Sequence, residues 1–139
     1  MKSQSLEQTQ KLAAQLAKQL RPGLVIALNG DLGTGKTTFV RFLARACGIT
    51  DHVHSPTFNI LNIYAGKLPF YHFDFYRLND LENIDSAEFI PSQDGITVIE
   101  WAEKFPEILP EDFLEICIIS ATETQRDFSF IPHGNLEKS

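Results

Sequence analysis

Residues 30–37 read GDLGTGKT and match the spacing G-x-x-x-x-G-K-[ST] at every fixed position. Glycines at 30, 33 and 35 let the backbone take positive φ angles and bring its N–H groups against phosphate oxygens. Lys36 supplies a cation for the β- and γ-phosphates, and the hydroxyl of Thr37 suits a Mg²⁺ ion. Because this segment lies between an apolar run at 24–28 and a helical pattern from residue 36, it predicts a site for a nucleoside triphosphate.

Two carboxylates are candidates for the other side of a Mg²⁺–phosphate site. Asp74 lies in YHFDFYRL, where strand alternation puts it on one face with His72, which we interpret as a partner that orients or shields it. Glu100 follows the apolar segment ITVI, at the strand end where ligands gather in α/β sheets. The structural alternatives are a solvent-facing Asp74 on an edge strand and a Glu100 that only caps the next helix.

Two further residues near these motifs have weaker signals. Thr57, in the segment HSPTF at 54–58, lies where a switch loop brings a hydroxyl to Mg²⁺ and the γ-phosphate. The Ser-Pro-Thr sequence is also typical of an ordinary turn. Trp101 follows Glu100 and is interpreted as a packing residue that could report on the site spectroscopically.

The elements that must position these residues alternate between helix and strand. Ser5 and Gln8 form a predicted capping box before a helix that the Pro22-Gly23 turn stops. The other expected elements are strands at 24–28, 58–64, 69–75, 95–99, 113–119 and 128–131, and a helix at 36–47. The close return at 58–75 predicts an antiparallel hairpin. The fold class expected is α/β, a P-loop NTPase-like three-layer domain with a mixed central sheet, in a single domain over residues 1–139.

Composition limits the possible partners. The net charge is −6 and the 12 basic residues are scattered, so the chain by itself is not expected to hold nucleic acid. No apolar run approaches the length of a membrane span or of a signal peptide. Cys47 and Cys117 lie far apart and are expected to be buried, reduced thiols, which fits a cytoplasmic protein.

The class of nucleotide reaction is less constrained by the residues themselves. The Asn-Lys-x-Asp signature of guanine-specific switches is missing, so ATP is the expected nucleotide. A small-metabolite kinase would need a lid with several arginines, whereas Arg77 and Arg126 are the only ones after residue 67. The two alternatives to an ATPase are such a kinase and a non-hydrolysing, nucleotide-gated binding module.

Four ordered motifs, GDLGTGKTT, SPTF, YHFDFYRL and IEWAE, resemble those of the bacterial TsaE (YjeE) family. The resemblance implies a mixed α/β P-loop ATPase of tRNA threonylcarbamoyladenosine (t6A) biosynthesis that uses ATP and Mg²⁺. It implies TsaD and TsaB as partners: this pair transfers the threonylcarbamoyl group to tRNA, and the TsaE-like ATPase resets it between turnovers. Contact with tRNA would be indirect, through that complex.

The resemblance also assigns residues. Lys36, Asp74 and Glu100 would be catalytic, and Thr37, Asp74 and Glu100 would hold the metal. The residues expected to bind the nucleotide are Thr9, Gly33, Thr34, Gly35, Lys36, Thr37, Thr38, Thr57, Glu100 and Arg126. Two departures from the family pattern are Thr34 in place of alanine and the segment 79–85, which contains neither proline nor glycine.

Overall fold

The computed structural model describes residues 2–3, 5–30, 36–49, 61–66, 68–74, 94–102, 109–120 and 125–134. Its elements, in chain order, are β1 (Lys2–Ser3), α1 (Leu6–Ala17), β2 (Val25–Asn29), α2 (Lys36–Ala46), β3 (Leu61–Tyr64), β4 (Phe70–Asp74), β5 (Ile96–Glu100), β6 (Phe113–Ser120) and β7 (Arg126–His133).

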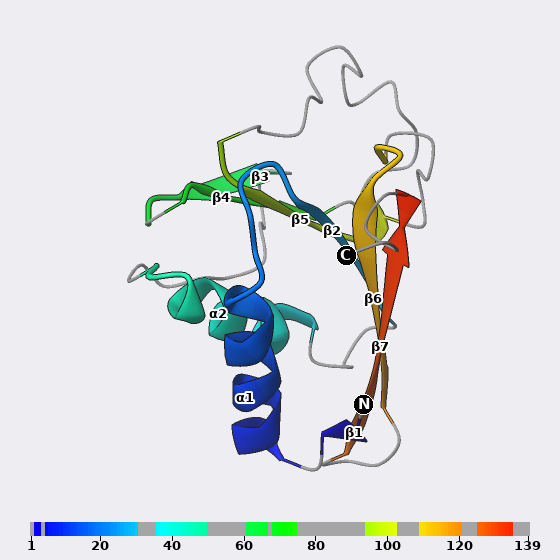
Figure 1. The fold of residues 1–139 in the computed structure, drawn as a ribbon. Coiled ribbons are helices and arrows are strands. Elements are labelled where there is room, and N and C mark those ends of the chain that lie inside the picture. The colour runs from blue at the N-terminus through cyan, green and yellow to red at the C-terminus, as the bar shows by residue number, and fades with distance from the viewer. Residues whose placement is uncertain are drawn as a thin grey trace.

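The described strands form one mixed sheet in the order β1-β7-β6-β2-β5-β4-β3 (Figure 1). The inner strands β6, β2, β5 and β4 run parallel to one another. Antiparallel pairs extend the sheet on both sides, through β3 on β4 and through β7 and β1 beyond β6. The predicted α/β class and the predicted hairpin are therefore confirmed, while β1 was not predicted from the sequence.

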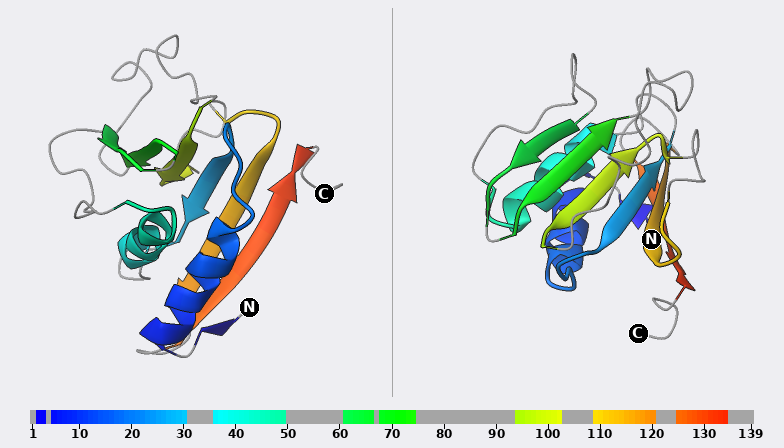
Figure 2. Two further views of the ribbon diagram at one scale, coloured as in Figure 1. Left: turned by 60° about the vertical axis from the view of Figure 1, so that its left-hand side comes forward. Right: turned by 90° about the horizontal axis from the view of Figure 1, so that it is seen from above.

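Both helices cover the same face of the sheet (Figures 1 and 2). Apolar residues of α2, such as Phe39 and Leu43, pack against alternate residues of β2, Ile26 and Leu28, and all four are at most 1% exposed. The Phe39 ring reaches across the sheet to Phe128 of β7, with 5.3 Å between ring centroids. This helix-covered face holds the larger core cluster, because strand side chains alternate between faces and only one set can meet the helices.

The opposite face of the sheet carries a second, smaller core cluster. Val25, Ala27, Ile99 and Ala102 are buried there, with Trp101 packed against them. No helix in the described part of the chain lies over this face. Strand β2 is thus buried on both sides, as its continuous apolar run predicted.

The helix ends show the local chemistry expected from the sequence. The Ser5 side chain accepts a hydrogen bond from the backbone N–H of Gln8 and caps α1. Helix α1 ends at Ala17, earlier than its apolar pattern indicated, and Gly23 takes a φ of 92° in the turn that follows. Neither described helix is long and apolar enough to cross a membrane.

Candidate functional site

The candidate residues converge because three parallel strands end at one edge of the sheet. The register places Glu100, the last residue of β5, opposite Leu28 of β2 on one side and opposite Asp74 of β4 on the other. Gly30 follows β2 directly, and α2 begins at Lys36. The loop motif and both predicted carboxylate positions therefore share the carboxyl edge of adjacent strands, where ligands bind in open α/β sheets.

Lys36 is the first residue of α2 and is only 5% exposed. Its Nζ donates a hydrogen bond to the carbonyl oxygen of Gly30 at 2.5 Å, and lies 3.5 Å from the centroid of the Trp101 ring. A cation over an indole face is attracted by the ring quadrupole, most strongly where water is excluded. The ammonium group is therefore held between the start of the loop and the turn after β5.

Trp101 has a left-handed backbone conformation, with φ of 63°. Such a conformation is unusual for a bulky residue, and outliers of this kind cluster at functional sites. It turns the chain sharply after Glu100 and brings the indole ring both to the second core cluster and to Lys36. The predicted packing role of Trp101 is confirmed. Its contact with Lys36 was not predicted, because strand and helix patterns carry no signal for a contact set by one unusual φ angle.

His72 contacts the second candidate carboxylate, Glu100. It lies on the helix-covered face of β4 and is fully buried, and its Nε2 is 2.5 Å from Oε2 of Glu100, which is 2% exposed. The predicted partnership of His72 with Asp74 stays a prediction, and the bond to Glu100 is a contact that the sequence did not predict. The backbone of Asp74 is described at the end of β4, but its side chain lies outside the described part.

The amino end of α2 has the chemistry of an anion-binding site. Lys36, Thr37 and Thr38 form its first turn, which contains no acidic residue. The backbone N–H groups of a first turn have no partner within the helix, and the helix dipole makes this end positive. This geometry is compatible with phosphate binding, and the phosphate-binding role of these residues stays a prediction.

The short strand β1 links the amino end of α1, which contains Thr9, to the start of β7 at Arg126. Ser3 pairs with Arg126, which in turn lies opposite Ser120 at the carboxyl end of β6. Thr9 is buried in α1, and its Oγ1 donates to the Ser5 carbonyl oxygen at 3.2 Å. Nη1 of Arg126 donates to the carbonyl oxygen of Gln125. Contacts of Thr9 and Arg126 with a nucleotide stay predictions.

Some predicted site residues cannot be placed. Gly33, Thr34, Gly35 and Thr57 lie outside the described residues, as does the atypical segment 79–85. Their roles therefore stay predictions from the sequence.

The end of β2 is also anchored by a polar group that sequence reasoning missed. Nδ2 of Asn29 donates to Oε2 of Glu115 at 2.9 Å, and Oε1 of the same carboxylate is 3.0 Å from Nε2 of His133. The thiol of Cys117 also donates to Oε2, at 3.6 Å. These residues fix the position immediately before Gly30. Cys47 and Cys117 are not joined in a disulfide, and both are only half-buried, whereas the sequence predicted buried thiols.

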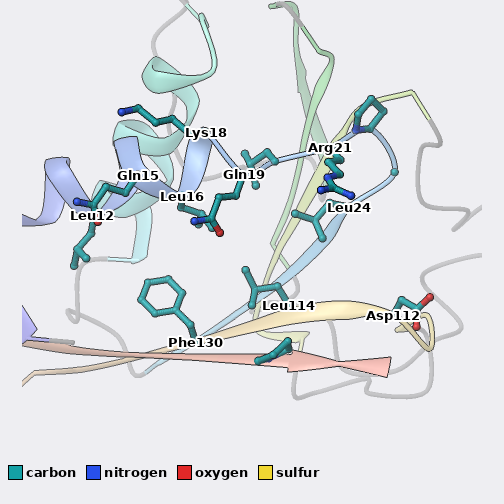
Figure 3. Close-up of a pocket in the computed structure, with 14 residues that line it drawn as sticks. Leu12, Gln15, Leu16, Lys18, Gln19, Arg21, Leu24, Asp112, Leu114 and Phe130 are labelled. Carbon is teal, nitrogen blue, oxygen red and sulfur yellow. The ribbon is translucent and has the colours of Figure 1, made fainter. Parts of the chain in front are cut away.

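A groove of about 980 Å³ lies at the other edge of the sheet (Figure 3). Leu16 of α1, Leu24, Leu114 and Phe130 line it, between α1 and the β6–β7 pair. Leu24 and Leu114 lie at the amino ends of β2 and β6, so this groove is separate from the loop edge.

Comparison with known proteins agrees with this arrangement. The family model "Threonylcarbamoyl adenosine biosynthesis protein TsaE" matches residues 3–128. The Bacillus subtilis protein TsaE is 42% identical to this chain, in a match that covers 93% of this chain and 82% of the relative. The Synechocystis TsaE is 46% identical, in a match that covers 74% of this chain and 69% of the relative. The crystal structure of Bacillus subtilis YdiB superposes with a TM-score of 0.83 at 36% identity, covering 99% of this chain and 88% of that one. The chain therefore belongs to the TsaE family of threonylcarbamoyl adenosine biosynthesis proteins.

Proposed function

We propose that this protein binds ATP with Mg²⁺ at the carboxyl edge of β2, β5 and β4 and hydrolyses it in t6A biosynthesis. One observation carries the ATPase proposal: buried Lys36, in the first turn of α2, contacts both Gly30 at the start of the loop and Trp101 directly after Glu100. Membership of the TsaE family supports the pathway. We propose that the reaction takes place in the cytoplasm.

The chain's own groups have separate tasks in this reaction. Lys36 and the N–H groups of the first turn of α2 bind the phosphates. The donor chemistry fits Mg²⁺, since the hydroxyl of Thr37 and the carboxylates of Asp74 and Glu100 are the hard oxygen ligands it prefers. When bound, the ion would neutralise charge on the phosphate oxygens. Glu100 would hold it through water or orient the attacking water molecule.

We propose that the target of the cycle is the TsaB–TsaD complex, which ATP hydrolysis resets between turnovers. The net charge of −6 supports indirect contact with tRNA, because a chain that gripped RNA by itself would need a basic surface. Arg77 and Arg126 are the only arginines after residue 67, so the chain has few arginines to complete the transition-state charge. Intrinsic activity should therefore be weak and rise with partners.

The test is ATP hydrolysis by the purified chain, with and without the TsaB–TsaD pair, using Lys36→Ala as the blank. Strong stimulation by the pair is the expected result. Brisk hydrolysis that ignores the pair would overturn the partnership and support the kinase alternative, to be followed by an acceptor screen. Tight ATP binding without turnover in either condition would overturn the ATPase and favour a nucleotide-gated module.

A further inference from the structure

Among the described side chains beside the site, His72 is the most buried ionisable one, and it contacts Glu100 rather than solvent. Its strand position is opposite Val98, while Asp74 is the residue opposite Glu100. The imidazole therefore reaches diagonally along the helix-covered face, toward the carboxyl edge, to meet Oε2 of Glu100 at 2.5 Å. Long side chains can bridge such diagonal neighbours in a sheet.

Fold stability is a poor explanation for this buried pair. Replacing both partners of a buried hydrogen bond with apolar groups of the same shape can be nearly neutral or stabilising. Here the pair also leaves the Nδ1 atom of His72 buried without a hydrogen-bond partner among the described residues. An unpartnered buried polar atom is unfavourable, so the arrangement indicates a requirement at Glu100 itself.

We propose that His72 is a positioning residue for Glu100. Whenever Glu100 is ionised, the proton of the shared hydrogen bond lies on Nε2 of His72, which donates to Oε2. This bond fixes the carboxylate by one oxygen and sets its orientation for Mg²⁺ or for the attacking water. His72 touches neither nucleotide nor metal. The inference rests on the proposed function, because it assigns Glu100 the role given there.

The test compares two amides that differ in reach. The amide nitrogen of His72→Gln can occupy the place of Nε2, whereas the shorter side chain of His72→Asn cannot. The asparagine variant should lose about 10–100-fold in partner-stimulated kcat, with KM for ATP little changed, and the glutamine variant should recover most of it. Thr97→Val is the matched control: Thr97 is buried on β5, faces away from Glu100, and has no partner for its hydroxyl among the described residues.

A second readout does not depend on turnover. ADP affinity is measured by calorimetry with Mg²⁺ and with EDTA, and the ratio of the two constants reports how well the carboxylates hold the ion. His72→Asn should reduce this ratio while leaving the affinity in EDTA unchanged, and Thr97→Val should change neither. A role in folding alone would lower thermal stability without changing the ratio.

Equal kcat and equal Mg²⁺ ratios for the asparagine, glutamine and wild-type proteins would overturn the inference. If the asparagine variant does not fold, imidazole ¹⁵N spectra of the wild type decide instead. The signals of His72 should report a protonated Nε2 and should move when Mg²⁺ and ADP are added; signals that do not move overturn the proposal. A wild-type protein without ATPase activity refutes the proposed function separately, and the Mg²⁺ ratio then still tests His72.

Discussion

Replacing Lys36 by methionine removes the ammonium group while keeping most of the side chain's volume. This distinction matters because the side chain is buried and its end lies over the Trp101 ring. A truncation to alanine would combine the loss of charge with the loss of packing. Methionine is unbranched and flexible enough to fill the same space.

The expected loss is confined to the charged contact with phosphate. A hydrogen bond to a charged group contributes about 1.5–3 kcal/mol, which corresponds to roughly 10–150-fold in the dissociation constant. The N–H groups in the first turn of α2 remain in the variant, so binding should weaken without disappearing.

Isothermal titration calorimetry with ADP and Mg²⁺ at fixed ionic strength measures this loss. Lys18→Met is the matched control, because Lys18 is exposed at the carboxyl end of α1 and the same charge is removed. It should bind ADP like the wild type. A folded Lys36→Met protein with an affinity within about threefold of wild type would refute the assignment of this lysine to phosphate.

Three other predictions concern stability and reactivity. Ser5→Ala should lower the free energy of unfolding by about 1 kcal/mol and the Tm by about 3–5 °C in calorimetry, with recovery in Ser5→Asp, since the side chain caps α1. Gly95→Ala should lower the free energy of unfolding measured in urea by about 1–3 kcal/mol, because the new Cβ would clash with the Pro69 carbonyl oxygen. Gly66→Ala should lower it less, because its Cβ would meet the flexible end of the Ile49 side chain. Burial raises the pKa of the Cys47 thiol above its ordinary value of 9.0. In a Cys117→Ser background at pH 9.0, iodoacetamide should therefore react more slowly with the native protein than with the urea-unfolded protein. The raised pKa of Cys47 also lowers the free energy of unfolding as the pH rises from the unfolded-state pKa through the folded-state pKa. Equal alkylation rates in the native and unfolded states would contradict the raised pKa.

The local patterns predicted much of the fold because each reflects short-range physics. The apolar run before Gly30 became the doubly buried strand β2, and the lysine of the loop motif became the first residue of α2. The segment YHFDFYRL was predicted to form a strand that ends near Asp74, and β4 ends at this residue. The two-residue strand β1 could not be predicted, because a segment this short carries no period and forms only by pairing with β7.

The sequence by itself determined that the loop follows an apolar strand and that each of the two carboxylates lies at the end of a strand. The spacing of glycines and lysine along the chain predicts the loop, and the carboxyl ends of parallel strands share one edge of a sheet. The positions of the loop and of the two carboxylates could therefore be inferred from the sequence. Only the tertiary structure decided which side chains meet there. The bond from His72 to Glu100 depends on the register of β4 against β5, and the contact of Trp101 with Lys36 depends on one left-handed residue after β5. Both are set by packing between segments far apart in the chain, and local sequence patterns do not record such contacts.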